Sequence, residues 1–103
     1  MEIYPNLSGN DRCDNEFMIA AQSGVEEAFN KLMNKYKFAL YFMLLKMVAN
    51  RSDAEDLTIE TFSKAFTNIH HYDPQHSFST WLFRLAYANA IDHLDIRRLK
   101  DAS

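Results

Sequence analysis

Histidine side chains are the residues of this 103-residue chain best suited to binding a metal. His70, His71 and His76 lie close enough in the sequence to chelate an ion together. No fourth ligand is evident beside them, so we interpret all three as polar loop residues. The sequence also lacks a glycine-rich phosphate loop, an H-E-x-x-H motif, a C-x-x-C pair and a nucleophile elbow. We therefore expect no metal, no other cofactor and no enzymatic activity.

Carboxylates crowd the segment from Ser52 to Phe66, which we predict to be a helix. Ser52 and Glu55 fit the S-x-x-E capping box of a helix start. One face of this helix carries small residues suited to close packing. The other face mixes acidic and apolar side chains, namely Asp56, Ile59, Glu60 and Ser63, with Phe62 and Phe66 at its border. Such a face is either the solvated back of an amphipathic helix or a surface for a partner. In both cases the carboxylates lack the environment that a catalytic acid–base pair needs, so we expect none on this helix.

Composition restricts the class of protein. The chain is 48% hydrophobic with only two glycines and two prolines, which favours helices over turns. No apolar run approaches the roughly 20 residues that span a bilayer, and the N-terminus does not resemble a signal peptide. The single Cys13 cannot form an internal disulfide. Together these features predict a cytoplasmic protein that does not associate with membranes.

The net charge of −3 weighs against a protein that binds duplex DNA by itself, since phosphate contacts need an excess of lysine and arginine. The charge is distributed unevenly, however. Acidic residues lie on the helix described above, whereas Arg97, Arg98 and Lys100 lie near the C-terminus. One surface for a protein and another for nucleic acid would fit this distribution, as would an ordinary helical domain.

Hydrophobic periodicity predicts four helices in one domain, residues 14–103, preceded by a flexible tail, residues 1–13. Asp14 is expected to cap a short helix that Gly24 terminates. The other helices are predicted from Val25 to Val48, from Ser52 to near His70, and from Ser77 or Ser79 to Leu94. Residues 70–77 are predicted to be a loop. The fold class is therefore all-α, a small four-helix bundle-like domain.

The acidic helix resembles region 2 of the bacterial sigma-70 family, specifically the extracytoplasmic-function (ECF) group. The family pattern is close to D-A-E-D-L-V-Q-E-T-F-L-R-A-W, and residues 53–66 read DAEDLTIETFSKAF. Similarity continues through residues 72–86 and 90–94, and residues 20–36 match the opening helices of the family. Three ordered blocks at family spacing are strong evidence. The resemblance implies a domain of the sigma region 2 type, without the second, helix-turn-helix domain of family members.

In the family, this domain docks on a coiled coil of the polymerase β′ subunit. It also reads the minus-ten promoter element as a single strand. The resemblance implies that this chain is a transcription initiation factor whose partners are core RNA polymerase and promoter DNA, with an anti-sigma factor as a further class of partner. By residue match, the polymerase-binding residues would be Asp56, Ile59, Glu60, Ser63, Phe62 and Phe66.

Capture of unpaired bases requires aromatic surfaces and cationic groups along one strand. The loop and the last helix offer several, and Tyr72 and His76 could equally be structural. We predict DNA contacts from His71, Tyr72, His76, Phe78, Phe83, Arg84, Tyr87, Asn89, Arg97 and Arg98. For Trp81, Leu82 and Leu85 we favour core packing.

The sequence departs from the family pattern at three places. Ile59 stands where glutamine is usual, Tyr87-Ala88 stands where Arg-Asn is usual, and Asp95 stands where arginine is common. The second departure, with the net negative charge, keeps open an alternative: a helical protein-interaction adaptor without DNA binding. A helix-turn-helix repressor is disfavoured because no basic recognition helix appears.

Overall fold

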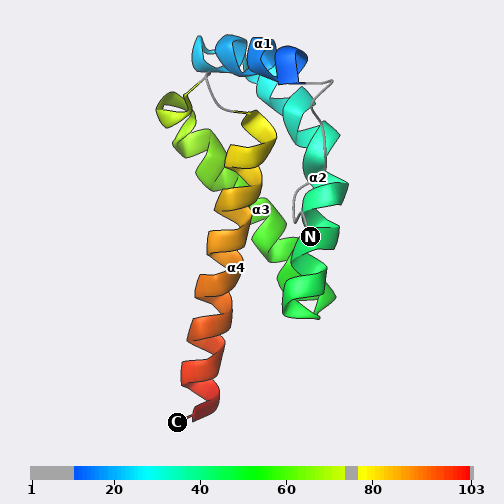
Figure 1. Ribbon diagram of the computed structural model, residues 1–103, viewed down its shortest axis with the longest axis vertical. Helices are drawn as coiled ribbons and strands as arrows, with labels where there is room; N and C mark the ends of the chain where they lie inside the picture. Colours follow the sequence, from blue (N-terminus) through cyan, green and yellow to red (C-terminus); the bar gives the residue numbers. More distant parts are fainter. Residues whose placement is uncertain (1–10, 74–76, 103) are drawn as a thin grey trace.

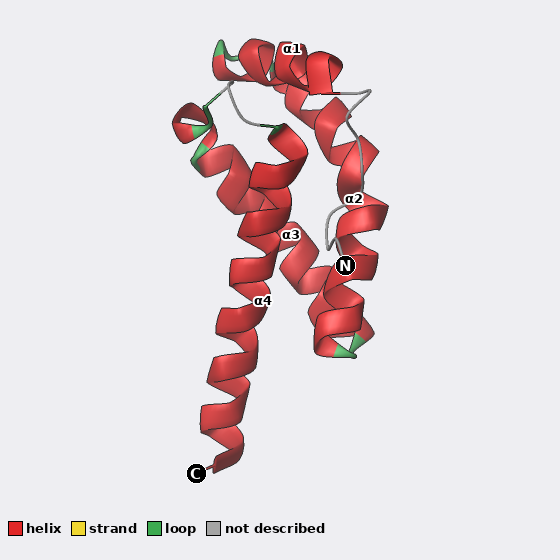
Figure 2. Cartoon of the chain, in the orientation of Figure 1, coloured by secondary structure: helices red, strands yellow, loops and turns green. Residues whose placement is uncertain are grey.

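The computed structural model describes residues 11–73 and 77–102 of the chain. All regular secondary structure within these residues is helical (Figure 1, Figure 2). The elements in chain order are α1 Asp11–Gln22, α2 Glu26–Val48, α3 Arg51–Thr67, the short 3₁₀ helix η2 Ile69–His71, and α4 Phe78–Ala102. The predicted all-α fold with four helices is confirmed.

The first helix begins earlier than the sequence suggested. Because α1 starts at Asp11, residues 11–13 are helical and do not belong to the predicted tail. The role of Asp14 as N-cap is also wrong. Its side chain is fully buried, Lys35 Nζ lies 2.7 Å from its Oδ1, and the Tyr36 hydroxyl donates to its Oδ2. Asp14 therefore joins α1 to α2.

The end of α1 is a Schellman motif built around Gly24. Gly24 has a φ of +97°, a conformation that costs a side-chain-bearing residue energy. Its N–H donates to Ala21 O, and the N–H of Val25 donates to Ala20 O, both at 3.0 Å. This pair of bonds satisfies two carbonyls at the helix end. The predicted termination at Gly24 is confirmed.

Helix α2 supplies the centre of the core. Its buried residues are Ala28, Phe29, Leu32, Tyr36, Leu40, Leu44 and Val48, which recur at helical spacing as predicted. Tyr36 packs against Phe78 and Phe83 of α4, with ring centroids 5.7 and 6.3 Å apart. Val25 is 51% exposed, because it precedes the helix as its N-cap residue.

The start of α3 corrects the predicted capping box. Asn50, not Ser52, is the N-cap, and its Oδ1 accepts a hydrogen bond from the Asp53 N–H at 2.9 Å. Because the helix begins at Arg51, Ser52 already lies in its first turn, and both Ser52 and Glu55 are exposed. Asparagine suits this position since its short side chain reaches the N–H three residues on.

This assignment makes a stability prediction. Asn50→Ala should lower the free energy of unfolding by about 1 kcal/mol, because one N–H of the first turn loses its acceptor. Ser52→Ala should change it by less than about 0.5 kcal/mol. Urea unfolding followed by circular dichroism measures both values. An equal loss in the two variants would show that the cap is misassigned.

The last two boundaries also differ from prediction. Helix α3 ends at Thr67 instead of near His70, and η2 follows directly. Helix α4 begins at Phe78, consistent with a cap at Ser77, whose Oγ lies 3.5 Å from the Thr80 N. It continues beyond Leu94 to Ala102, where the apolar periodicity is lost.

The four helices pack so that α2, α3 and α4 contact one another and α1 closes one end. Figure 1 shows α1 lying across the ends of α2 and α4, and the C-terminal end of α4 extending beyond the other helices. Residues 95–101 are all exposed, which explains their lack of apolar periodicity. The core thus lies around the first half of α4.

Candidate functional site

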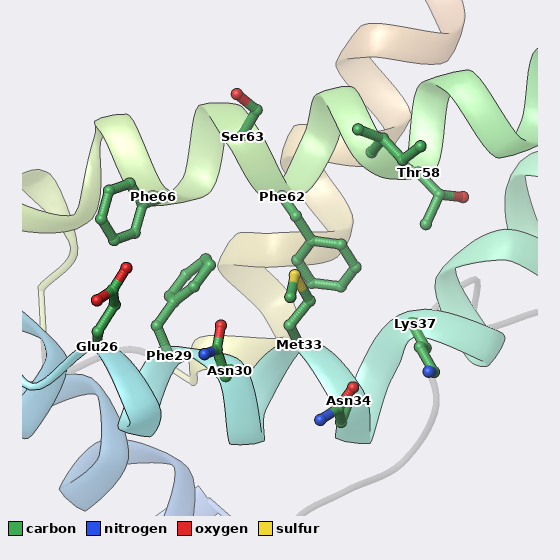
Figure 3. Close-up of a pocket in the computed structure, with 11 residues that line it drawn as sticks. Glu26, Phe29, Asn30, Met33, Asn34, Lys37, Thr58, Phe62, Ser63 and Phe66 are labelled. Atoms are coloured by element: carbon green, nitrogen blue, oxygen red, sulfur yellow. The ribbon is translucent and has the colours of Figure 1, made fainter.

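A groove of about 520 Å³ lies between α2 and α3 (Figure 3). Phe29, Met33 and Phe62 contribute apolar surface to it, and Phe66 packs edge-on against Phe29 with ring centroids 5.2 Å apart. Its lining residues are Glu26, Phe29, Asn30, Met33, Asn34, Lys37, Thr58, Ile59, Phe62, Ser63 and Phe66. An open apolar groove of this kind is typical of a protein-binding surface.

A second groove of about 530 Å³ continues the first along the same two helices. Its lining residues are Lys37, Phe38, Tyr41, Phe42, Glu55, Thr58 and Ile59. Lys37, Thr58 and Ile59 line both grooves, so the two form one continuous depression, which we call the α2–α3 groove. Ile59, at the junction, is 69% exposed.

The predicted polymerase-binding residues of α3 fall into two groups. Ile59, Ser63 and Phe66 are exposed and line the groove, while Asp56 and Glu60 are exposed residues of the same helix and do not line it. Phe62 differs from the prediction of a border residue. It is only 5% exposed, because its side chain points toward α2 and forms the floor of the groove (Figure 3).

Helix α2 also contributes to this surface, which was not predicted from the sequence. Phe38 and Phe42 are 66% and 57% exposed although both are large aromatic residues. They are four residues apart and lie off the buried stripe of α2, so one face of the helix carries both. Two aromatic residues four positions apart, both outside the buried positions of the helix, could have predicted an exposed aromatic face from the sequence.

A separate pocket of about 380 Å³ lies where the loop after η2 meets α4. His71, Tyr72, Asp73, Ser77, Thr80, Trp81 and Arg84 line it. Tyr72 is 3% exposed, and its ring packs against Trp81 and Phe78 at centroid distances of 5.4 and 6.0 Å. Tyr72 therefore forms a wall of this loop pocket, whereas His71, Asp73 and Arg84 are exposed.

Besides Tyr72, three of the predicted DNA contacts are buried. Phe78 and Phe83 are 0% and 1% exposed, because both pack on Tyr36. Asn89 is 5% exposed. Its amide donates to Thr61 Oγ1 at 3.1 Å, and its carbonyl oxygen lies 2.7 Å from Lys64 Nζ. Asn89 thus connects α4 to α3 and is not accessible to a DNA base.

The remaining predicted contacts are placed as follows. Arg84, Tyr87 and Arg98 are exposed on α4. Arg97 is exposed, but its guanidinium lies 3.5 Å from the carboxylate of Asp53 in α3, which partly neutralises the charge of Arg97. The same carboxylate lies 3.2 Å from His93 Nε2. His76 lies outside the described residues. Of the predicted cations, Arg84 alone lines the loop pocket.

The histidines do not form a metal site in the part of the chain that the structure describes. His70 and His71 are exposed, and His71 Nδ1 lies 3.3 Å from Asn68 Oδ1. Residues 11–73 and 77–102 contain no group of three or more potential ligands. No helix within them has the length and apolar character required to cross a membrane.

Comparison with known proteins agrees with the geometry. Residues 32–99, which include most of α2, all of α3 and most of α4, match the Sigma-70 region 2 family. The chain belongs to the sigma-70 region 2 family. The resemblance inferred from the sequence is thereby confirmed.

Curated relatives include ECF sigma factors. The chain is 36% identical over 73 residues to the ECF RNA polymerase sigma factor SigW of Bacillus subtilis, an alignment that covers 71% of this chain and 39% of SigW. It is 30% identical over 84 residues to the RNA polymerase sigma-H factor of Pseudomonas aeruginosa, covering 82% of this chain and 44% of that factor. The chain therefore spans about two fifths of the length of these relatives.

A solved structure has the same fold. It is an engineered region 2 of sigmaE, determined in complex with GTAAAA. The TM-score is 0.79 at 29% sequence identity, and the superposition covers 84% of this chain and 90% of the other. The sigma region 2 architecture predicted from the sequence is confirmed by this match.

Proposed function

We propose that this sigma region 2 domain docks on the β′ coiled coil of core RNA polymerase and captures the minus-ten promoter element as a single strand. It would act in the cytoplasm as a transcription initiation factor without enzymatic activity. The main observation behind this proposal is that Ile59, a large apolar residue, is exposed on a helix face that also presents Asp56 and Glu60 to solvent.

The α2–α3 groove has the chemistry that a helical partner requires. Apolar side chains along the groove can bury the face of an amphipathic helix, and the exposed aromatic residues Phe38 and Phe42 extend that surface. Exposed carboxylates on α3 supply the complementary charge for a partner with basic residues. The docking surface therefore includes α2 as well as the α3 residues predicted from the sequence.

The loop pocket supports the nucleic-acid part of the proposal. It combines aromatic walls from Tyr72 and Trp81 with the cationic side chain of Arg84. Aromatic side chains of this kind stack on an unpaired base, and an arginine beside them contacts the phosphates of the strand. The loop pocket and the α2–α3 groove share no lining residue, so the two proposed binding sites do not overlap.

Fluorescence anisotropy with and without core polymerase tests this function. We expect the domain to bind a labelled single-stranded oligonucleotide that carries a minus-ten element and to be retained by core polymerase in a pull-down. Binding of polymerase without any binding of the strand, free or in the complex, would favour the protein-interaction adaptor. Binding of duplex DNA alone would favour a repressor.

Arg84→Ala should weaken binding of the single strand to a similar extent for every sequence, because a phosphate contact carries no base preference. The negative slope of log K against log salt should become less steep by about 0.7, the value for one phosphate contact on a single strand. Titrations at several salt concentrations measure this slope. Arg51→Ala, at an exposed arginine at the start of α3, is the control, and an equal effect of the two substitutions would contradict the pocket assignment.

A further inference from the structure

Helix α1 contacts η2 and the loop that carries the pocket, although neither the groove nor the pocket contains an α1 residue. We propose that Gln22 of α1 is a positioning residue, which holds residues 69–72, the turn that carries one side of the pocket, in the shape that captures a strand. This inference rests on the proposed function, and it assigns a role to the first helix of the domain.

The side chain of Gln22 binds the loop backbone at two places. Its Nε2 donates to the carbonyl oxygen of Ile69 at 2.8 Å and to that of Tyr72 at 3.2 Å. Ile69 is the first residue of η2, and Tyr72 follows its last residue. The partly buried amide of Gln22 therefore holds both ends of this turn, although Gln22 lies 47 residues from Ile69 and 50 residues from Tyr72 in the sequence.

A second contact from α1 orients the side chain that forms the pocket wall. The Tyr72 hydroxyl donates to Asn15 Oδ1. Since the Tyr72 ring also packs on Trp81, the position of Tyr72 is defined by its hydrogen bond to α1 together with its ring contact to α4. Backbone and side chain of Tyr72 are thus both held from α1.

The turn itself is a 3₁₀ helix of only three residues, closed by local hydrogen bonds. His71 N donates to Asn68 O at 2.9 Å and Tyr72 N to Ile69 O at 3.3 Å. A short turn of this kind is weakly specified by its own backbone. If this turn became ordered only when the strand binds, the loss of conformational entropy would reduce the affinity for the strand. A turn that is already ordered avoids that cost. The amide of Gln22 supplies this preorganisation.

The test uses Gln22→Ala and Gln22→Glu in the full chain, with Ser23→Ala as the matched control. Ser23, the residue directly after α1, is exposed, and its hydroxyl donates to Ile19 O and not to the turn. Gln22→Glu keeps the size of the side chain but replaces the donor by a carboxylate that carbonyl oxygens repel. The probes are a single-stranded oligonucleotide carrying GTAAAA, a single-stranded pool randomised at six positions, and the isolated β′ coiled coil.

Both Gln22 variants should bind the strand about five- to tenfold more weakly, the effect expected of one or two lost hydrogen bonds. Affinity for the β′ coiled coil should stay unchanged, and amide hydrogen exchange at His71 and Tyr72 should accelerate. Ser23→Ala should behave as the wild type.

Unchanged affinity of the Gln22 variants for the strand would overturn the inference while leaving the proposed function intact. A parallel loss of affinity for the strand and the coiled coil would also overturn it, since general destabilisation would then be the cause. If the wild type bound neither oligonucleotide probe, strand capture itself would be contradicted and the role of Gln22 would fall with it.

Discussion

Asp56→Lys is expected to lower the affinity of the domain for the β′ coiled coil by at least about tenfold. Asp56 is exposed on α3 and has no salt bridge or side-chain hydrogen bond within residues 11–73 and 77–102. Its replacement therefore reverses a charge at the docking surface without breaking an internal contact. Isothermal titration or anisotropy with the isolated coiled coil measures the change.

The design of this experiment separates docking from folding. Circular dichroism should show the same helix content and melting temperature for Asp56→Lys and the wild type. Asp92→Lys makes the same charge change at an exposed position of α4, away from the groove, and serves as the matched control. Glu60→Lys would also break an internal ion pair, because Glu60 lies 3.2 Å from Lys64, so its effect on docking would be harder to separate from an effect on stability. Equal affinity of the Asp56 and Asp92 variants would rule out docking through this face of α3.

Asp14→Ala is expected to have the largest effect on stability, a loss of about 2–3 kcal/mol in the free energy of unfolding. The carboxylate is fully buried and accepts hydrogen bonds from Lys35 and from the buried Tyr36. Its removal takes away the acceptor for both groups and the contact that joins α1 to α2. The midpoint of urea unfolding at constant m-value measures the loss.

Glu16→Ala is the control for this substitution. Glu16 is an exposed acid two residues further along α1, and its removal should change the free energy of unfolding by less than about 0.5 kcal/mol. Tyr36→Phe should give an intermediate loss, because it removes one of the two donors and keeps the ring in the core. If Asp14→Ala and Glu16→Ala unfolded at the same urea concentration, the buried pair would contribute nothing to stability.

The sequence by itself determined the helices and the family. Hydrophobic residues of α2 recur at helical spacing, and such periodicity depends only on residues near one another in the chain. Three blocks at family spacing, of which the D-A-E-D-L block of α3 is one, were sufficient to identify sigma region 2. Helix boundaries were less accurate, because capping depends on one side chain, here Asn50 instead of Ser52.

Only the tertiary structure decided which polar and aromatic residues are accessible. Phe83 and Asn89 looked suited to nucleic acid by residue type, but the packing of α4 on α2 and α3 buries them. Asp14 and Gln22 gave no comparable signal, because their partners lie 21 to 50 residues away. Periodicity assigns a residue to a face of its own helix. The contacts of that face depend on how the helices pack, which places residues distant in the chain side by side.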